Sequence, residues 1–168
     1  RIVSILFSGN ENIDNATLKK QVSSKVKSLF NNGFLDTDQL RKDAQSIASY
    51  YQTNGYIDVI IDEPIIEYVE SSNEKFKEVN VIFQIYEGQK WYYGGMEVTG
   101  NTIFTDAEIA AVQSLRVGDI SNLESVQADY SAIADLYYNQ GYISNGIDIR
   151  DERNDTDMSV KFYMDITE

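Results

Sequence analysis

The feature that most constrains the fold of this chain is an internal repeat. Three blocks of the first half recur in the second half in the same order, at spacings of 91, 86 and 79 residues. A spacing that is constant within blocks and changes between them indicates that insertions fall in loops. The matched residues are Ile5, Phe7, Gly9 and Asn10 with Met96, Val98, Gly100 and Asn101; Leu40, Ala44, Ile47, Tyr51, Gly55 and Tyr56 with Val126, Tyr130, Ile133, Tyr137, Gly141 and Tyr142; and Val81, Phe83 and Ile85 with Val160, Phe162 and Met164.

The first copy predicts a strand, two helices and two further strands. The apolar run 2–7 is typical of a buried strand, and Ser8-Gly9-Asn10 ends it. A helix capped by Asp14 is expected to continue to Leu29, and a second one is capped by Thr37 and closed by Gly55. Alternating apolar residues then predict strands over 56–61 and 79–85, joined by a connection over 64–75.

The second copy repeats this order with clearer helix starts. Thr105 with Glu108, and Ser121 with Glu124, have capping-box spacing, and Gly141 closes the second helix. The last two strands are expected over 142–150 and 158–166. Gly94-Gly95 indicates a bulge in the first strand of this copy.

These elements predict an α+β fold of two tandem βααββ modules, over residues 1–88 and 89–168. In each, a three-stranded mixed sheet has one apolar face, and two antiparallel helices cover that face. Pro64 cannot donate a ladder hydrogen bond, so the second strand is expected at an edge and the third strand in the middle.

Composition excludes several classes of function. The formal net charge of −13 repels phosphate backbones and anionic headgroups, which disfavours nucleic acid and the membrane surface as partners. Without Cys or His, the chain lacks the usual zinc ligands and thiol or imidazole catalysis. We expect no enzyme, catalytic residue, metal or cofactor, and a protein as the partner. The start at Arg1 suggests a piece of a longer protein.

Several motifs resemble those of the POTRA (polypeptide-transport-associated) domains. They are the βααββ order, the strand ending in Gly-Asn, the Tyr-Tyr-x-x-x-Gly-Tyr motif that closes each second helix, and the run V-x-F-x-I-x-E-G from Val81 to Gly88. The resemblance covers nearly the whole chain. It implies the periplasmic part of a Gram-negative-type outer-membrane protein assembly factor of the BamA or TamA kind, which would touch the membrane only through a C-terminal β-barrel.

The resemblance and the fold together suggest a binding, chaperone-like module. An exposed strand edge offers unpaired backbone groups to another chain, so clients can bind by strand addition and be guided to the barrel for insertion. The expected partners are unfolded outer-membrane proteins or accessory assembly subunits. The alternative is a scaffold for fixed partners, like the divisome protein FtsQ or a platform for accessory lipoproteins. The proposed edge residues are Ile57, Asp58, Val59, Ile60 and Ile61, and Ile143, Ser144, Asn145, Ile147 and Ile149.

Other motifs admit structural explanations. Gly88, Trp91, Tyr92 and Tyr93 lie between the copies, where the aromatic residues either wedge the modules as a hinge or form a binding patch. One tyrosine of each Tyr-Tyr pair falls on a helix's apolar stripe and is expected in the core. The acidic run from Asp148 to Asp157 lacks the spacing of a calcium loop, so we expect a solvated turn.

Overall fold

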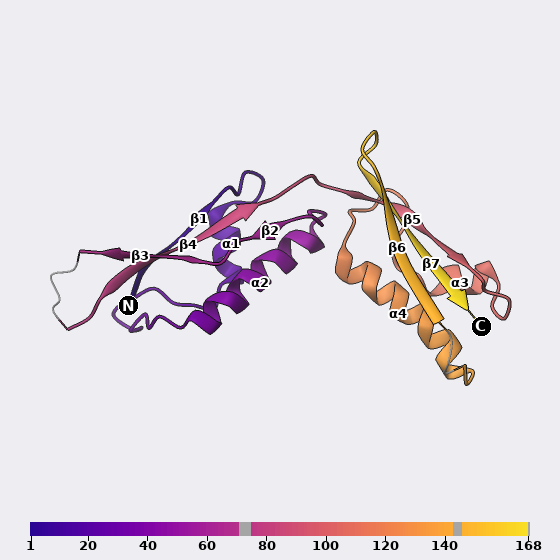
Figure 1. Cartoon of the computed structure of the whole chain (residues 1–168), viewed down its shortest axis with the longest axis horizontal. Helices are drawn as coiled ribbons and strands as arrows, with labels where there is room; N and C mark the ends of the chain where they lie inside the picture. Colours follow the sequence, from indigo (N-terminus) through magenta and orange to yellow (C-terminus); the bar gives the residue numbers. More distant parts are fainter. Residues whose placement is uncertain (71–74, 143–145, 168) are drawn as a thin grey trace. The chain divides into compact units, whose positions relative to one another are not determined.

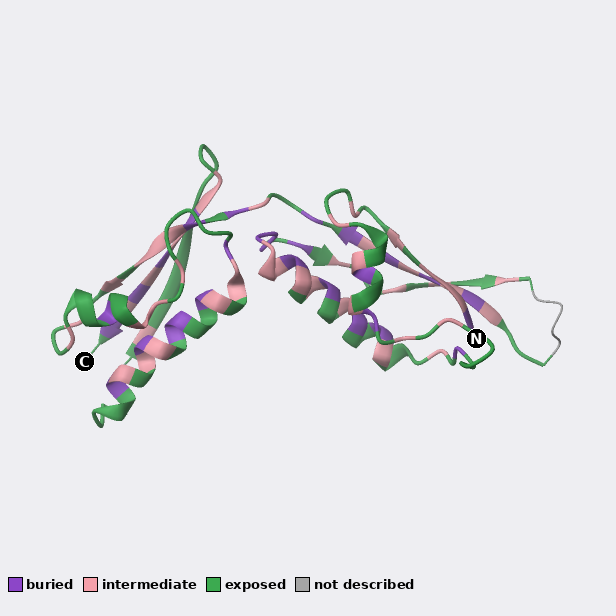
Figure 2. Cartoon of the chain, turned by 180° about the vertical axis from the view of Figure 1, so that it is seen from behind, coloured by how far each residue is buried: buried purple, intermediate pink, exposed green. Residues whose placement is uncertain are grey.

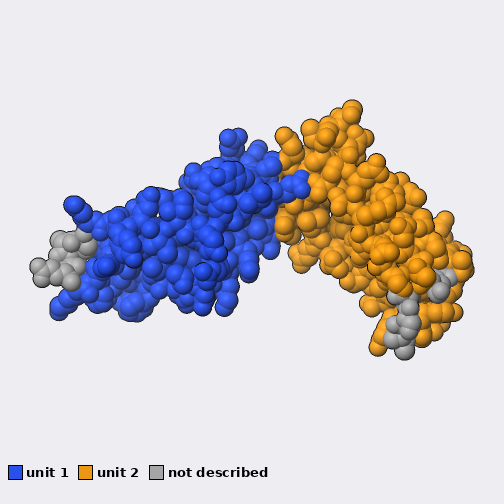
Figure 3. Space-filling model, in the orientation of Figure 1, with its two compact units in different colours: residues 1–51, 58–88 blue, residues 52–57, 89–168 orange. Residues whose placement is uncertain are grey.

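The computed structural model describes residues 1–70, 75–142 and 146–167. The chain divides into two compact units (Figure 3). Unit 1 consists of Arg1–Tyr51 and Asp58–Gly88, and unit 2 of Gln52–Ile57 and Gln89–Glu168. The two units differ from the two sequence copies in one segment: residues 52–57 belong to the first copy in the sequence but to unit 2 in the structure.

The order of elements is the predicted one, with one additional strand in the first copy (Figure 1). The first copy contains β1 (Ile2–Ser8), α1 (Asn15–Gln21), α2 (Thr37–Thr53), β2 (Ile60–Ile61), β3 (Ile65–Val69) and β4 (Glu78–Tyr86). The second contains β5 (Tyr92–Thr99), α3 (Asp106–Val112), α4 (Leu123–Asn139), β6 (Gly146–Asn154) and β7 (Ser159–Thr167).

Each sheet is mixed, and the last strand of each copy lies in its middle. β4 pairs in parallel with β1 on one side and antiparallel with β2 and β3 on the other. β7 pairs in parallel with β5 and antiparallel with β6. Both central strands bury every second residue, as their alternating sequences predict.

The helices cover one face of each sheet, and the core lies between the two layers. In Figure 2 the buried positions of α2 and α4 lie on the side that faces the strands. Ile47 and Ile133, which match each other in the repeat, are both fully buried, and so are Tyr51 and Tyr137. The tyrosine of each pair that was expected in the core is therefore in the core, while Tyr138 is exposed.

The strand ladders correct one of the three repeat spacings. The equivalent ladder pairs are Ile5–Val81 and Phe7–Phe83 in unit 1, and Met96–Phe162 and Val98–Met164 in unit 2. The third block therefore recurs after 81 residues, and the predicted spacing of 79 was wrong by two. A slip of two residues keeps the same side chains on the same face, so alternation alone cannot detect it.

The first helix of copy one is shorter than predicted. It ends at Gln21, and the next residue, Val22, is already extended. The carboxylate of Asp43 on α2 accepts hydrogen bonds from the backbone N–H groups of Ser23 and Ser24, at 2.8 and 3.0 Å. These bonds hold the chain in a non-helical course, and Leu29, expected on the apolar stripe, is 97% exposed.

The strand expected over 56–61 was also wrong in extent. Only Ile60–Ile61 pairs with β4, and the edge resumes as β3 inside the segment predicted to be a loop. Pro64 lies between the two pieces, and its missing N–H explains why the ladder is interrupted there.

Most of the local signals are confirmed, and two helix starts move by one residue. The Asp14 cap, the Thr105–Glu108 capping box and the bulge between Tyr93 and Met96 are present. α2 is capped by Asp36, whose Oδ1 accepts from two backbone N–H groups, and α4 by Asn122. Thr37 and Ser121, the predicted caps, each lie next to the actual one.

Candidate partner-binding strand edges

The edge strand of unit 2 is β6, the second strand of the second copy. It was expected to end at residue 150, but it continues to Asn154, so its predicted end was wrong by four residues. Nine residues, Gly146–Asn154, pair with β7, and no other described strand pairs with β6 on its outer side. Ile147 is half-buried against the core, whereas Ile149 is 51% exposed. The other three predicted residues, Ile143, Ser144 and Asn145, lie outside the described residues.

Charged side chains line most of the β6 strand. Arg153 forms an ion pair with Asp151, with 2.8 Å between Nε and Oδ2, and its guanidinium lies over the Trp91 ring. The guanidinium of Arg150 lies 3.8 Å from the centre of the Tyr163 ring. Such charges are a common means of protecting an edge from indiscriminate pairing. The prediction that the acidic run forms a turn was wrong for most of the run, because Asp148, Asp151 and Glu152 lie in β6 and only Asp155 and Asp157 lie in the turn that follows. Among the described residues, no group of three or more Asp or Glu side chains could hold a metal ion.

The corresponding edge of unit 1 is divided between β2 and β3. Ile60, Ile65 and Tyr68 are exposed on it, at 59%, 47% and 70%. β3 extends this edge beyond the predicted residues. This five-residue strand lies in a segment that was predicted to be a connection.

The first residues of the predicted edge lie elsewhere. Ile57 and Val59 are buried and precede β2, and only Asp58 between them is exposed. Ile57 belongs to the core of unit 2, together with Tyr93 and Tyr137. Ile57, Asp58 and Val59 thus form no strand on which a client could extend the sheet.

The aromatic residues between the copies are mostly core residues of unit 2. Trp91 and Tyr93 are 5% and 2% exposed, and Tyr92 is 42% exposed. The backbone N–H of Trp91 donates to the carbonyl of Gly55, and its carbonyl accepts from Ser121. Gly88 adopts φ = 71°, which favours glycine. The expectation of an aromatic hinge remains a prediction.

Three buried hydroxyls of unit 2 have no hydrogen-bond partner within the described part of the chain. They belong to Tyr93, Ser121 and Tyr130. Burial, reinforced by the nearby Asp129 carboxylate, raises the pKa of Tyr93 to about 12, and burial also raises the pKa of Tyr130. Both phenols are therefore neutral at physiological pH.

Two structurally important residues were missed by the sequence reading, although the repeat contains their signal. Asp43 and Asp129 are 1% and 2% exposed, and both bind backbone N–H groups that follow the first helix of their copy. The two aspartates are 86 residues apart, the spacing of the second block. An identical acidic residue at one repeat position on an apolar helix stripe indicates a shared buried role.

A third missed residue is Glu87, which is 6% exposed at the end of β4. Its carboxylate accepts hydrogen bonds from the Tyr51 hydroxyl at 2.7 Å and from both the backbone and the side chain of Asn12. Burial alone would raise the pKa of Glu87, but these hydrogen bonds outweigh it, and the pKa lies below its ordinary value.

Comparison with known proteins identifies the two copies. The POTRA family model, described as "Surface antigen variable number repeat", matches residues 1–88 and 92–168. A Treponema pallidum protein named "Putative outer membrane protein assembly factor" is 28% identical over 98% of this chain. The outer membrane protein assembly factor BamA of Nitratidesulfovibrio vulgaris is 23% identical over 91% of it. The chain spans 20% of the length of each relative.

Two solved structures show the same fold. The POTRA3-5 fragment of Haemophilus influenzae BamA superimposes with a TM-score of 0.78, at 24% identity, over 99% of this chain and 65% of that one. BamA of Haemophilus ducreyi lacking POTRA domains 1–3 gives a TM-score of 0.72, at 18% identity, over 98% of this chain and 28% of that one. Among the described residues, no helix has the length and apolar character needed to span a membrane.

Proposed function

Because this chain belongs to the POTRA family, we propose that it forms two periplasmic modules of an outer-membrane protein assembly factor, over residues 1–88 and 89–168. Their role is to bind segments of unfolded outer-membrane proteins, or of accessory subunits, by strand addition. The observation that carries the proposal is β6, a nine-residue edge strand with no described partner on its outer side. The β2–β3 edge of unit 1 provides a second, shorter site.

Strand addition suits this role because it uses main-chain hydrogen bonds. Such bonds give affinity without demanding one sequence, as a receptor for many clients requires. The exposed Ile149 offers an apolar contact to the added strand, and the charges around it limit how many unrelated chains can pair.

A peptide with its backbone donors removed tests the proposal. We expect a capped ten-residue peptide of alternating leucine and threonine to shift the amide NMR signals of residues 146–154. N-methylation of alternate amides removes hydrogen bonds along one side of the peptide, so one of the two methylated versions should bind about tenfold or more weakly. Equal binding by the unmodified peptide and both methylated versions would contradict strand addition.

Two neighbouring proline substitutions in β6, Asp148→Pro and Ile149→Pro, test the same proposal on the protein side. Adjacent residues of an antiparallel strand direct their N–H groups to opposite sides, so one proline breaks the β7 ladder and the other removes a donor from the open edge. The variant that keeps the thermal stability of the parent is the informative one, and it should bind the peptide about tenfold more weakly.

The second candidate function is a scaffold for fixed partners. The charges along β6 favour it, because they disfavour indiscriminate pairing. If the chain is such a scaffold, the folded protein should not bind the alternating peptide, and the amide NMR signals should not shift.

A further inference from the structure

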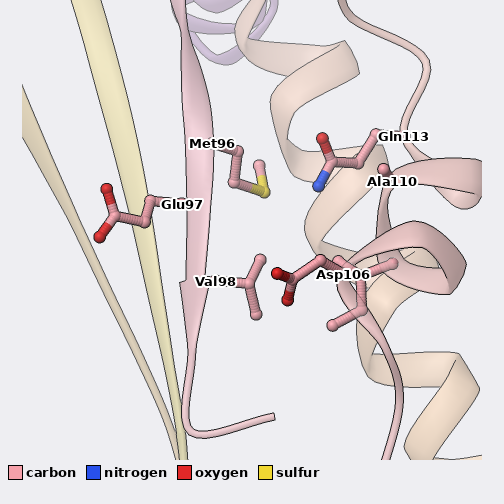
Figure 4. A pocket seen from close by; sticks show the side chains of 7 residues that line it. Met96, Glu97, Val98, Asp106, Ala110 and Gln113 are labelled. Atoms are coloured by element: carbon pink, nitrogen blue, oxygen red, sulfur yellow. The ribbon is translucent and has the colours of Figure 1, made fainter.

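A hollow lies between β5 and α3 of unit 2, at the sheet edge opposite β6. Its volume is about 300 Å³. Met96 and Val98 of β5 and Ile109 and Ala110 of α3 supply the apolar lining, and Asp106 and Gln113 supply polar groups. Figure 4 shows Met96 and Val98 directed toward α3, whereas the side chain of Glu97 points away from it.

The backbone of β5 borders this hollow on its open side. Glu97 is among the lining residues although its side chain is turned to the other face, where it pairs with Lys161 at 2.6 Å. We infer that the backbone around Glu97 forms part of the wall. β5 pairs only with β7 among the described strands, so its outer donors and acceptors over residues 96–99 have no strand partner in the described chain.

The other half of the same edge is already closed by the chain itself. The backbone N–H of Tyr93 donates to the carbonyl of Asp119, and the Tyr93 carbonyl accepts from the N–H of Gly118. The N–H of Ser121 donates to the carbonyl of Trp91, so residues 118–121 cover the start of β5. The bridge between Tyr92 and Ile120 is antiparallel. The first part of the β5 edge thus already accepts an extended segment of the same chain. The second part of the β5 edge, beside α3, has no such segment among the described residues.

The first copy has a larger apolar side chain at one equivalent position of the hollow, a phenylalanine in place of valine. With the spacing of 91 residues that holds from β1 to the end of α1, Val98, Ala110 and Gln113 correspond to Phe7, Lys19 and Val22. The Phe7 ring stacks on Phe83, and Val22 is 6% exposed. The smaller side chain of Val98 is thus a property of the second copy, and Phe7 provides the matched side chain for an experiment.

Charge indicates which segment fits. Residues 89–168 hold fourteen acidic and five basic residues, a net charge of −9, whereas residues 1–88 have a net charge of −4. Within the hollow, the Asp106 carboxylate accepts a hydrogen bond from the Asn101 side chain at 3.0 Å, and no basic residue is among the lining residues. An acidic, partly apolar groove favours a basic, partly apolar ligand.

We propose that the groove between β5 and α3 binds an extended polypeptide segment in which apolar side chains alternate with polar ones and include a lysine or arginine. The segment adds to β5 over Met96–Thr99, its apolar side chains enter the hollow, and its cation approaches Asp106. This site is separate from the β6 edge, on which the proposed function rests.

The experiment compares two capped seven-residue peptides of alternating valine and threonine, one with a central lysine and one with glutamate. For the lysine peptide we expect amide NMR shifts at residues 96–99 and 106–113, and at least tenfold weaker binding by the glutamate peptide. Shifts confined to residues 146–154 would support the β6 edge and overturn the β5 groove. Shifts confined to 96–113 would do the reverse, so the two proposals fail separately.

Two substitutions complete the test. Val98→Phe introduces the first copy's side chain and fills the hollow, so it should weaken lysine-peptide binding at least tenfold. Asp106→Asn should weaken binding of the lysine peptide severalfold and reduce its salt dependence, without weakening the glutamate peptide. Unchanged affinity in a folded Val98→Phe protein would overturn the proposal. If this variant does not fold, the binding of N-methylated lysine peptides to the parent protein is measured instead. Equal affinity of the unmodified peptide and every methylated version would overturn strand addition at β5.

Discussion

At the scale of single residues, Glu87 links three parts of unit 1. It lies at the end of β4, and it receives hydrogen bonds from Tyr51 of α2 and from Asn12 in the turn after β1. The carboxylate thereby satisfies a buried hydroxyl and a backbone N–H together. Removing the carboxylate would leave both donors buried without a hydrogen-bond partner, which costs free energy of folding.

Glu87→Gln should therefore reduce stability in a pH-dependent way. The folded pKa is lowered, so the unfolded chain binds the proton more readily, and the stabilisation is present above about pH 4.5 and lost as pH falls through the folded pKa. At pH 7 we expect the variant to lose about 1–2 kcal/mol, and the difference from the parent should shrink toward pH 3. Urea denaturation between pH 3 and 7 measures this, with Glu67→Gln as an exposed control. A difference independent of pH would contradict this role for the carboxylate.

At the scale of elements, a buried aspartate holds the end of the first helix in each copy. In unit 2 the Asp129 carboxylate, on α4, accepts hydrogen bonds from the backbone N–H groups of Ser114 and Leu115, at 2.7 and 3.2 Å. These N–H groups follow α3 directly. The longer helix therefore fixes where the shorter one stops, as Asp43 does for α1.

Asp129→Asn should destabilise unit 2 by about 2 kcal/mol, because hydrogen bonds to a charged acceptor contribute about 1.5–3 kcal/mol. The amide also presents donors to groups that are themselves donors. Hydrogen exchange should accelerate at Ser114 and Leu115 before the rest of the unit. Asp135→Asn, an exposed change on the same helix, is the control and should leave both measurements unchanged. Unaltered exchange in Asp129→Asn would refute the proposed role.

At the scale of the whole molecule, the units that pack together differ from the repeats in the sequence. Residues 52–57 follow the first copy's second helix, yet they are counted with unit 2, and Ile57 is 8% exposed in the unit 2 core. A fragment cut at the repeat boundary would lack these contacts.

Ile57→Ala should therefore destabilise unit 2 rather than unit 1. The expected loss is about 2–4 kcal/mol, the usual cost of truncating a buried isoleucine. Trp91 is the single tryptophan and is buried in unit 2, so its fluorescence follows the unfolding of that unit. Ile61→Ala in β2 is the control and should leave the Trp91 transition in place. If Ile57→Ala also leaves it unchanged, residues 52–57 add no stability to unit 2.

The sequence by itself determined the number of copies, the order of their helices and strands, and the face that each central strand buries. Those features depend on local spacing: a period of two for strands, glycine at Gly55 and Gly141, and the Asp14 and Thr105 caps. It also indicated which strands form the edges, because Pro64 cannot pair in a sheet's middle.

Only the tertiary structure decided the strand register, the C-terminal end of α1 and the extent of the edges. A slip of two residues preserves alternation, so pairing with β1 and β5 was needed to establish the spacing of 81 residues. Likewise, the apolar spacing of Val22, Val26 and Leu29 suits a helix, and the distant carboxylate of Asp43 prevents it. The hollow beside β5 depends on which side chains of two elements face each other, and local patterns carry no information about that.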